Sequence, residues 1–444
     1  MTPTVLGRGL GPRPGTGSRR SRPGRVRLGT VPGVTEPIVD ESPADHEFRL
    51  AARAFLEAHA PPRPVGVSSS PLGKEMSPEL EAEHVQECRD WQATLAAGGW
   101  AGITWPAEYG GRGGTVAQAR IFAQEESRFL VSSGVFMVAI GMVGPTIITH
   151  GTEDQKQFYL PRMLNGEHVW CQLFSEPGAG SDLAGLTTRA ELDGDEYVVT
   201  GQKVWTSGAH FSDWGMMLVR TNWDVPKHQG ITYILVDMRS PGIEVRPLRQ
   251  ITGYAHFNEV FLTDVRIPVA NVVGEVNNGW RIAQTTLGNE RQMIGGGGSG
   301  VGFKSLAALA RNCGRSEDPL IRQELARSYT RFEILNWIGQ RAKARAKAGL
   351  PPGPEMSIMK LAVSQRVAAD GDLALALEGA GGMLTGADAI ADGTYQQLFL
   401  NQWSVRIGGG TEQIQRNVIG ERVLGLPGEP RPDKTAAFRD LPRN

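Results

Sequence analysis

The stretch from Ser175 to Asp182, SEPGAGSD, constrains the fold of this chain more than any other segment. Two glycines, two serines and one proline within eight residues are incompatible with a helix or a regular strand. Backbone N–H groups and hydroxyls in such a loop can instead face a phosphate or the polar edge of a ring. We therefore expect a polar loop that is able to bind a ligand.

An alternating segment follows this loop and predicts β-structure. Glu196 to Thr200 is typical of a strand, Gly201-Gln202 of a corner, and Lys203 to Ser207 of a second strand that includes Trp205. Such a hairpin would suit the wall of a site for a flat aromatic cofactor. An ordinary hairpin with a surface loop explains the same residues, because glycine-rich loops are a weak signal by themselves.

Periodicity divides the chain into three main parts. Residues 44–168 show the apolar spacing of helices, residues 169–279 show short period-two or continuous apolar runs between turn residues, and residues 280–426 return to helical spacing. No helix-length pattern interrupts the middle part, which favours an antiparallel sheet over a parallel one. The predicted fold class is α+β: an N-terminal helical domain, a middle antiparallel β domain and a C-terminal helical bundle, followed by a polar tail over 427–444.

Composition argues against several classes of protein. The 444 residues carry a net charge of −1, which provides no global field for nucleic acid or a membrane. The three cysteines are widely spaced and the eight histidines lack ligand spacing, so we expect neither a disulfide framework nor a metal. Glycine and proline interrupt the uncharged run 129–149, which predicts a buried helix there rather than a membrane span.

Residues 1–43 differ from the rest of the chain. The first 34 residues hold seven arginines and no acidic residue, among many glycines and prolines. Glycine and proline oppose the amphipathic helix of an organelle transit peptide, and a nucleic-acid-binding tail would need aromatic residues that this segment lacks. We expect a disordered basic extension.

Two motifs carry a resemblance to a known family. SEPGAGSD followed by GQKVWTSGA at 201–209 resembles the flavin-contacting middle domain of the acyl-CoA dehydrogenases, and GGGTEQIQRNVIGER at 408–422 resembles their C-terminal signature. Both motifs stand in the family's order and spacing, and the similarity runs from about residue 45 to residue 426. The resemblance implies two helical domains around a β domain, usually in a tetramer, and an FAD-dependent α,β-desaturation of an acyl-CoA thioester.

The resemblance also implies a set of binding residues. The cofactor contacts it implies are Phe174, Ser175, Ser181, Trp205, Thr206, Ser207, Arg311, Gly381, Gly382, Thr411 and Gln413, and the substrate contacts are Ser181, Arg291 and Gly410. Two positions depart from the family pattern. Glu378 precedes the glycine pair where the family often has glutamine, and the loop at Arg311 lacks the family's phenylalanine.

The catalytic base departs from the commoner family pattern as well. Many members place a glutamate immediately before the Gly-Thr of the last signature, where this chain has Gly409. Isovaleryl-type and long-chain-type members take the glutamate from the first helix of the C-terminal domain, just before an arginine, and this chain has Glu290-Arg291 there. The resemblance thus implies Glu290 as the general base for the α proton, and we expect the Glu412 side chain to point elsewhere.

Three functions stay open at this level. The first is a dehydrogenase of fatty-acid or lipid β-oxidation that passes electrons to an electron-transfer flavoprotein. The second is an acyl-CoA oxidase or flavin monooxygenase on the same fold, and the third is a non-catalytic partner subunit of a mixed tetramer. Glu290 favours the dehydrogenase. We expect a homo- or hetero-tetramer with no nucleic-acid or membrane partner, in a bacterial-type cytoplasm or, alternatively, the mitochondrial matrix.

Overall fold

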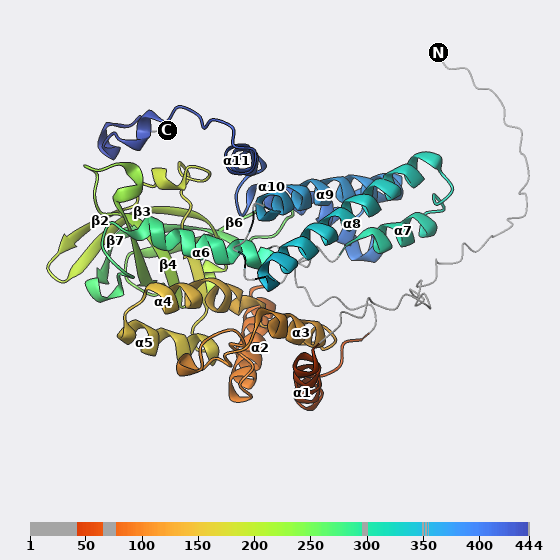
Figure 1. The fold of residues 1–444 in the computed structure, drawn as a ribbon, viewed down its shortest axis with the longest axis horizontal. Coiled ribbons are helices and arrows are strands. Elements are labelled where there is room, and N and C mark those ends of the chain that lie inside the picture. Colours follow the sequence, from red (N-terminus) through yellow and green to blue (C-terminus); the bar gives the residue numbers. More distant parts are fainter. Residues whose placement is uncertain are drawn as a thin grey trace, which may run out of the picture.

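The computed structural model of the chain describes residues 42–64, 77–294, 301–348, 350, 353 and 355–442. The basic extension up to residue 41, residues 295–300 and the side chain of Arg291 lie outside the described residues. Figure 1 shows the sheet at one end of the molecule, the long helices α7 to α10 at the other, and the N-terminal helices along one side. The predicted order of helical, β and helical parts is confirmed.

The N-terminal part is built from helices. It contains α1 (Pro43–His59), α2 (Pro78–Ala97), α3 (Val116–Glu126), α4 (Gly144–His150) and α5 (Glu153–Leu164). The side chains of Ser42, Ser77, Thr115 and Thr152 accept a hydrogen bond from the backbone N–H three residues on, at the starts of α1, α2, α3 and α5. These N-caps satisfy donors that the first turn of a helix leaves without partners, and they fix where each helix begins.

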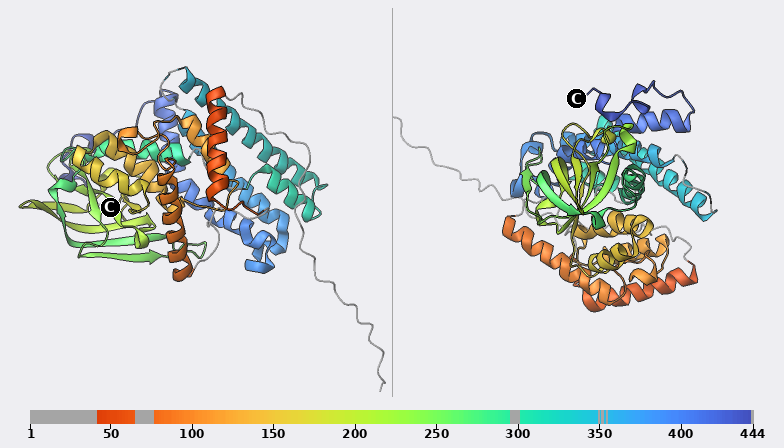
Figure 2. Two further views of the ribbon diagram at one scale, coloured as in Figure 1. Left: turned by 90° about the horizontal axis from the view of Figure 1, so that it is seen from below. Right: turned by 90° about the vertical axis from the view of Figure 1, so that its left-hand side faces the viewer.

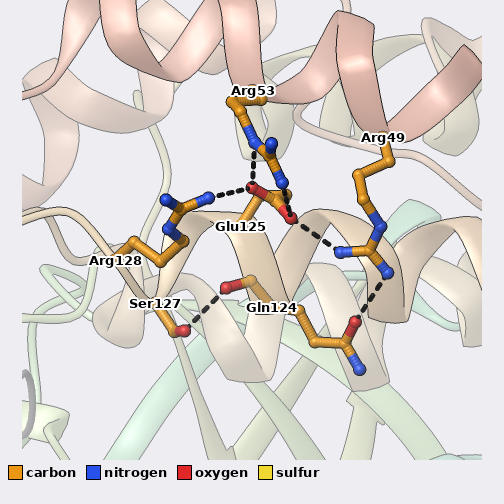
Figure 3. Close-up of polar contacts among 6 residues, drawn as sticks. All are labelled: Arg49, Arg53, Gln124, Glu125, Ser127 and Arg128. Carbon is orange, nitrogen blue, oxygen red and sulfur yellow. Dashed lines mark hydrogen bonds and ion pairs between the residues drawn. The ribbon is translucent and has the colours of Figure 1, made fainter. Parts of the chain in front are cut away.

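One carboxylate shared by three arginines joins α1 to α3 (Figure 3). The buried Glu125 accepts hydrogen bonds from Arg49 at 2.6 Å, from Arg53 at 2.9 Å and from Arg128 at 2.9 Å. Burial alone would raise the pKa of Glu125, but the three guanidinium groups outweigh it and lower this pKa to about 2. The carboxylate therefore stays charged and clamps the first helix onto the domain.

The uncharged run 129–149 is less regular than the single buried helix that the sequence predicts. It forms a 3-10 turn at Gly134–Phe136, a π-helical segment η3 at Ala139–Val143, and then α4. The indole of Trp105 lies against Gly144, in space that any larger side chain there would fill, and its Nε1 donates to the carbonyl of Ile140. No helix among the described residues is long and apolar enough to cross a membrane.

The middle part is a seven-stranded sheet. Its strands are β1 (Trp170–Leu173), β2 (Arg189–Asp193), β3 (Glu196–Ser207), β4 (Trp214–Arg220), β5 (Ile231–Asp237), β6 (Ile243–Leu248) and β7 (Phe257–Pro268). They lie in the order β1-β4-β2-β3-β7-β6, and β5 pairs along the whole length of β4, on the edge opposite to β1 and β2. The long pairings are antiparallel as predicted, but β1 runs parallel to β4, so the sheet is mixed.

The predicted corner at Gly201-Gln202 is wrong. β3 continues through these residues and pairs with β7 along its length, with shifts of register between Val199 and Gly201 and between Lys203 and Thr206. Gly201 is required by packing rather than by a turn, because a Cβ there would collide with the backbone and side chain of Thr188. The glycine therefore marks close approach of β2 to a bulged strand.

The C-terminal part begins with α6 (Gly279–Ile294), which lies across the sheet beside α4 (Figure 1). It continues as the bundle α7 (Phe303–Asn312), α8 (Pro319–Lys347), α9 (Glu355–Glu378), α10 (Thr394–Ile407) and α11 (Glu412–Val418). The residues after α11 return to the middle domain (Figures 1 and 2). There the backbone N–H of Phe438 donates to the carbonyl of Val225, and its ring covers the guanidinium of Arg220 at 3.6 Å.

Candidate active site

The polar loop that follows β1 is held by one buried carboxylate. Glu176 accepts hydrogen bonds from the backbone N–H groups of Thr187 and Thr188 at 2.7 and 2.9 Å, and from the Thr187 hydroxyl at 3.0 Å. Glu176 and Ala179 also exchange backbone hydrogen bonds at 3.1 and 3.0 Å, which closes a tight turn at Pro177-Gly178. The proline and glycine of the motif therefore form a turn, while the glutamate ties both ends of the loop together.

A fully buried lysine on β3 pairs with this carboxylate. Lys203 Nζ lies 2.8 Å from Glu176 Oε1 and donates as well to the carbonyls of Leu218 and Phe174, at 2.7 and 3.2 Å. Burial would raise the pKa of Glu176, but the ammonium and the donors at Thr187 and Thr188 lower it to about 2. Three acceptors satisfy the three protons of the ammonium, so the pair is complete and rigid. Residue-pattern reasoning missed it, although a lysine at an inward-facing strand position was the available signal.

The peptide group between Phe174 and Ser175 has a defined direction. Because the Phe174 carbonyl points at Lys203, the trans peptide turns the Ser175 N–H to the opposite side. The Ser175 carbonyl accepts from the N–H of Val204, which joins the start of the loop to β3. The loop thus presents an N–H and a hydroxyl at Ser175 beside the strand that carries Trp205.

Trp205 adopts a backbone conformation that tryptophan rarely takes. Its φ is 62°, in the left-handed region, at the bulge between Lys203 and Thr206. The residue is 57% exposed. Among the described residues, the one ring that its indole contacts is Phe257, in an edge-to-face arrangement with the ring centroids 5.8 Å apart. An exposed aromatic side chain on strained backbone is typical of a binding surface, because packing alone does not account for it.

Adjacent polar groups leave hydrogen-bonding capacity for a ligand. The hydroxyl of the buried Thr206 has no protein partner among the described residues, while its carbonyl accepts from Asn258 at 3.0 Å. Ser207 follows as an exposed residue, and Phe174 is buried behind the loop. The aromatic face of Trp205, the N–H and hydroxyl of Ser175 and the exposed Ser207 fit a flat ring with a polar edge, so the residues present are compatible with a flavin.

The far end of the loop is anchored by ionic contacts. Lys227 Nζ binds both carboxylate oxygens of Asp182 at 3.0 and 2.9 Å, and it also pairs with Asp433 of the C-terminal tail at 2.5 Å. Arg220 donates to the carbonyls of Ala184 and Leu186 just beyond. Ser181 itself stays exposed beside these anchors.

The two candidate bases differ sharply in their surroundings. Glu290 lies on α6, half-buried. Glu412 is buried and already engaged, by Arg406 at 3.0 Å and Ser364 at 3.1 Å; burial raises its pKa, but these partners outweigh burial and lower it. Its carboxylate is therefore used in holding α11 against the bundle.

The final signature forms a sharp turn. Gly409 and Gly410 have φ of 65° and 96°, and Gln415 occupies the space next to Gly410. Thr411 then caps α11, where its hydroxyl accepts from the N–H of Ile414 at 3.2 Å, and Gln413 is exposed. The glycines are needed for this turn, and Gly409 provides no acid or base.

The other predicted cofactor residues lie in the C-terminal bundle rather than on the sheet. Arg311 is exposed near the end of α7, and Gly381 and Gly382 lie in the 3-10 turn Gly379–Met383 after α9. Glu378, just before this turn, accepts from Gln396 at 2.7 Å through one oxygen, while its other oxygen has no partner among the described residues. Burial raises the pKa of Glu378. The predicted cofactor residues of this chain therefore form two sets, one beside the sheet and one in the C-terminal bundle.

Comparison with known proteins identifies the family. The chain matches the N-terminal, middle and C-terminal domains of acyl-CoA dehydrogenases over residues 42–167, 171–265 and 277–424. It is 41% identical over 355 residues to the acyl-CoA dehydrogenase IpdE1 of Mycobacterium tuberculosis, covering 79% of this chain and 91% of that protein. The chain belongs to the acyl-CoA dehydrogenase family, a family of flavin-dependent oxidoreductases, and it is an enzyme of that class.

Solved structures show the same fold. The Tcur3481-Tcur3483 steroid ACAD is 31% identical with a TM-score of 0.73, and the match covers 88% of this chain and 99% of that one. The ChsE4-ChsE5 complex from Mycobacterium tuberculosis is 30% identical with a TM-score of 0.69, and the match covers 88% of this chain and 100% of that one. The predicted family and fold class are thus confirmed.

Proposed function

We propose that the protein desaturates an acyl-CoA thioester between its α and β carbons, with Glu290 as the base that removes the α proton. The observation that carries this proposal is the contrast between the two candidate positions for a base. Gly409 has no side chain and Glu412 holds α11 against the bundle, while α6 carries a half-buried glutamate at residue 290, immediately before Arg291. A general base must lie within hydrogen-bond reach of the proton that it removes.

The second element of the proposal is the wall formed by the loop at Ser175 and the bulge at Trp205. FAD, when bound, accepts the hydride from the β carbon. Trp205 would pack on the ring, and the Ser175 N–H with the hydroxyls of Ser175 and the exposed Ser207 would hydrogen-bond its polar edge. The Glu176–Lys203 pair keeps these groups in place and keeps the Phe174 carbonyl, an unfavourable neighbour for an acceptor edge, turned away.

Substrate and assembly are proposed at a coarser level. Ser181, Arg291 and Gly410 are the residues proposed to contact acyl-CoA, and Arg311, Gly381, Gly382, Thr411 and Gln413 to contact FAD, across a subunit interface for part of this set. Large apolar side chains stay exposed on the bundle, at Leu320, Trp337, Trp403 and Ile407. Such a surface is typical of a subunit interface. We therefore propose an oligomer, with further copies or with a second related chain, and an electron-transfer flavoprotein as electron acceptor.

The test uses the purified protein under anaerobic conditions. Its visible spectrum should show a bound flavin, and an acyl-CoA panel should bleach that flavin; the panel includes a steroid-bearing acyl-CoA because the related Tcur3481-Tcur3483 protein is a steroid ACAD. Glu290→Gln should retain FAD and bind acyl-CoA, but reduce its flavin at least ~10²–10⁴-fold more slowly. Glu412→Gln is the matched carboxylate control and should reduce flavin nearly as fast as the parent protein. Equal rates in Glu290→Gln and the parent would refute the assignment of the base.

A further inference from the structure

A chain of buried hydroxyls connects all three domains at one point. Thr146 lies on α4, Tyr233 on β5 and Thr286 on α6, and all three side chains are completely buried. Thr286 Oγ1 lies 2.9 Å from Thr146 Oγ1 and 3.4 Å from the Tyr233 hydroxyl. α4 contains the end of the uncharged run, β5 lies in the core of the sheet, and α6 is the helix that carries Glu290.

The acceptors present give this chain a direction. Thr146 must donate its one proton to the carbonyl of Met142 at 2.8 Å, because a carbonyl cannot donate. The 2.9 Å contact between the two threonines then needs the proton of Thr286, although this hydroxyl also lies 3.4 Å from the carbonyl of Ile282. Tyr233 consequently supplies the proton for two acceptors, Thr286 and the sulfur of Met216 at 2.9 Å. Each hydroxyl has one proton, and loss of any one hydroxyl removes a link between two of the three elements.

The end of the chain at Met142 lies in the π-helical segment η3. A π-bulge shifts carbonyls out of the regular i to i+4 pattern and frees them for other donors. Here the carbonyl of Ile140 accepts from Trp105 and that of Met142 from Thr146. Thr146 follows Met142 by four residues, so its hydroxyl bonds to the preceding turn as helical threonines do, and the interdomain chain ends on a carbonyl of η3.

The other end of the chain touches the proposed cofactor wall. The ring of Tyr233 meets the ring of Phe174 edge to face, with centroids 6.0 Å apart and an interplanar angle of 86°. Thr286 precedes Glu290 by four residues, one helical turn or about 6 Å along the axis, so both project from the same face of α6. Tyr233 thus links the residue behind the loop of Ser175 to the helix that carries the proposed base.

We infer that Tyr233, Thr286 and Thr146 are positioning residues that set the Glu290 carboxylate relative to the cofactor wall at Phe174. This inference rests on the proposed function. Proton abstraction and hydride transfer act on adjacent carbons held between base and ring, so a misplacement of about 1 Å is enough to slow the reaction ~10²-fold. Packing residues of equal burial elsewhere in the molecule should lower stability without slowing the reaction in this way.

The experiment compares Thr286→Val, Tyr233→Phe and Thr286→Ser in the full-length protein loaded with FAD. At saturating acyl-CoA, the first two should reduce flavin ~10- to 100-fold more slowly. Their FAD content, visible spectrum and substrate dissociation constant should stay within about twofold of the parent protein. Thr286→Ser restores the hydroxyl and should recover most of the rate. Tyr233→Phe keeps the ring against Phe174 and therefore folds even where the threonine variant does not.

Two controls separate positioning from a general loss of stability. Ser328→Ala removes another buried hydroxyl, which donates to Asp370 at 2.7 Å in the bundle, and should lower thermal stability without slowing flavin reduction. In a Glu290→Gln background, Thr286→Val should slow the residual reaction no more than about twofold, since Thr286 acts through Glu290. Parent-like rates in Thr286→Val and Tyr233→Phe would overturn this inference and leave the proposed function standing. The same would follow if Ser328→Ala slowed flavin reduction as much as Thr286→Val does. A parent protein that no acyl-CoA bleaches would instead overturn the proposed function.

Discussion

Lys203 and Glu176 form a buried ion pair, 2.8 Å between Nζ and Oε1, directly beneath the loop and the bulge that make the proposed cofactor wall. The lysine also binds the Phe174 and Leu218 carbonyls, and the glutamate accepts from the start of β2. One pair therefore controls the loop, β3 and the peptide direction at Ser175. A polar motif that would be mobile by itself becomes rigid through this single contact.

Removal of one partner of this pair should unfold the site. Lys203→Met leaves the Glu176 carboxylate buried without its counter-ion, and we expect a loss of about 3–5 kcal/mol in the free energy of unfolding together with loss of FAD. Lys156→Met is the matched control, because Lys156 is a half-buried lysine paired with a surface glutamate. Urea titration and the ratio of flavin to protein absorbance measure both quantities. A Lys203→Met protein that keeps stoichiometric FAD would contradict this role.

Trp205 should show opposite effects on stability and on cofactor binding. Trp205→Gly removes a side chain from a residue with φ of 62°, so the apoprotein should be as stable as the parent or up to ~1 kcal/mol more stable. The same change removes the proposed ring-packing surface, and the dissociation constant for FAD should rise at least tenfold. Trp205→Phe keeps an aromatic face and should lie between the two. If Trp205→Gly destabilises the apoprotein as strongly as it weakens FAD binding, the side chain serves packing instead.

Acid should loosen the N-terminal domain through Glu125. Its pKa is lowered from 4.5 to about 2 in the folded protein, because the three arginines outweigh the effect of burial. A carboxyl group with a lowered folded-state pKa contributes stability that is fully present above pH 4.5 and is lost as pH falls toward 2. Glu125→Gln should therefore lower the urea midpoint at pH 7 and flatten its decline between pH 5 and about 3. Glu153→Gln, at an exposed ion pair, should change neither.

The C-terminal tail should stabilise the middle domain. Phe438 covers Arg220, and the guanidinium in turn holds the carbonyls that follow the polar loop. Phe438→Ala should lower the free energy of unfolding by about 1–3 kcal/mol and open Lys434 and Arg439 to trypsin. Leu192→Ala is the control, because it truncates an apolar side chain of the middle domain that is exposed, whereas Phe438 is buried. Unchanged cleavage of the tail in Phe438→Ala would show that the backbone contacts alone hold it.

Much of the architecture follows from local sequence. Helical spacing and N-cap residues such as Thr152 depend on neighbours three or four positions away, and continuous runs of apolar residues mark β4 and β5, which are buried on both faces. The motif at 175–182 could be predicted as a loop because proline and glycine restrict the backbone wherever they stand. The family resemblance rests on the same contiguous residues.

The remaining features depend on residues far apart in the chain. Gly201 looks like a turn residue, yet Thr188 of the adjacent strand requires the glycine, and β3 passes straight through it. The run 129–149 looks like one buried helix, yet Trp105 and Thr146 capture its carbonyls and support a π-bulge. The ion pair of Lys203 and the hydroxyl chain through Tyr233 join segments 27 and 53 residues apart or more. Sequence by itself determined which elements form and which chemical groups the chain carries, because those properties are local. Only the tertiary structure decided which of these groups are buried, paired and aimed at a common point, because burial and pairing are properties of neighbours in space.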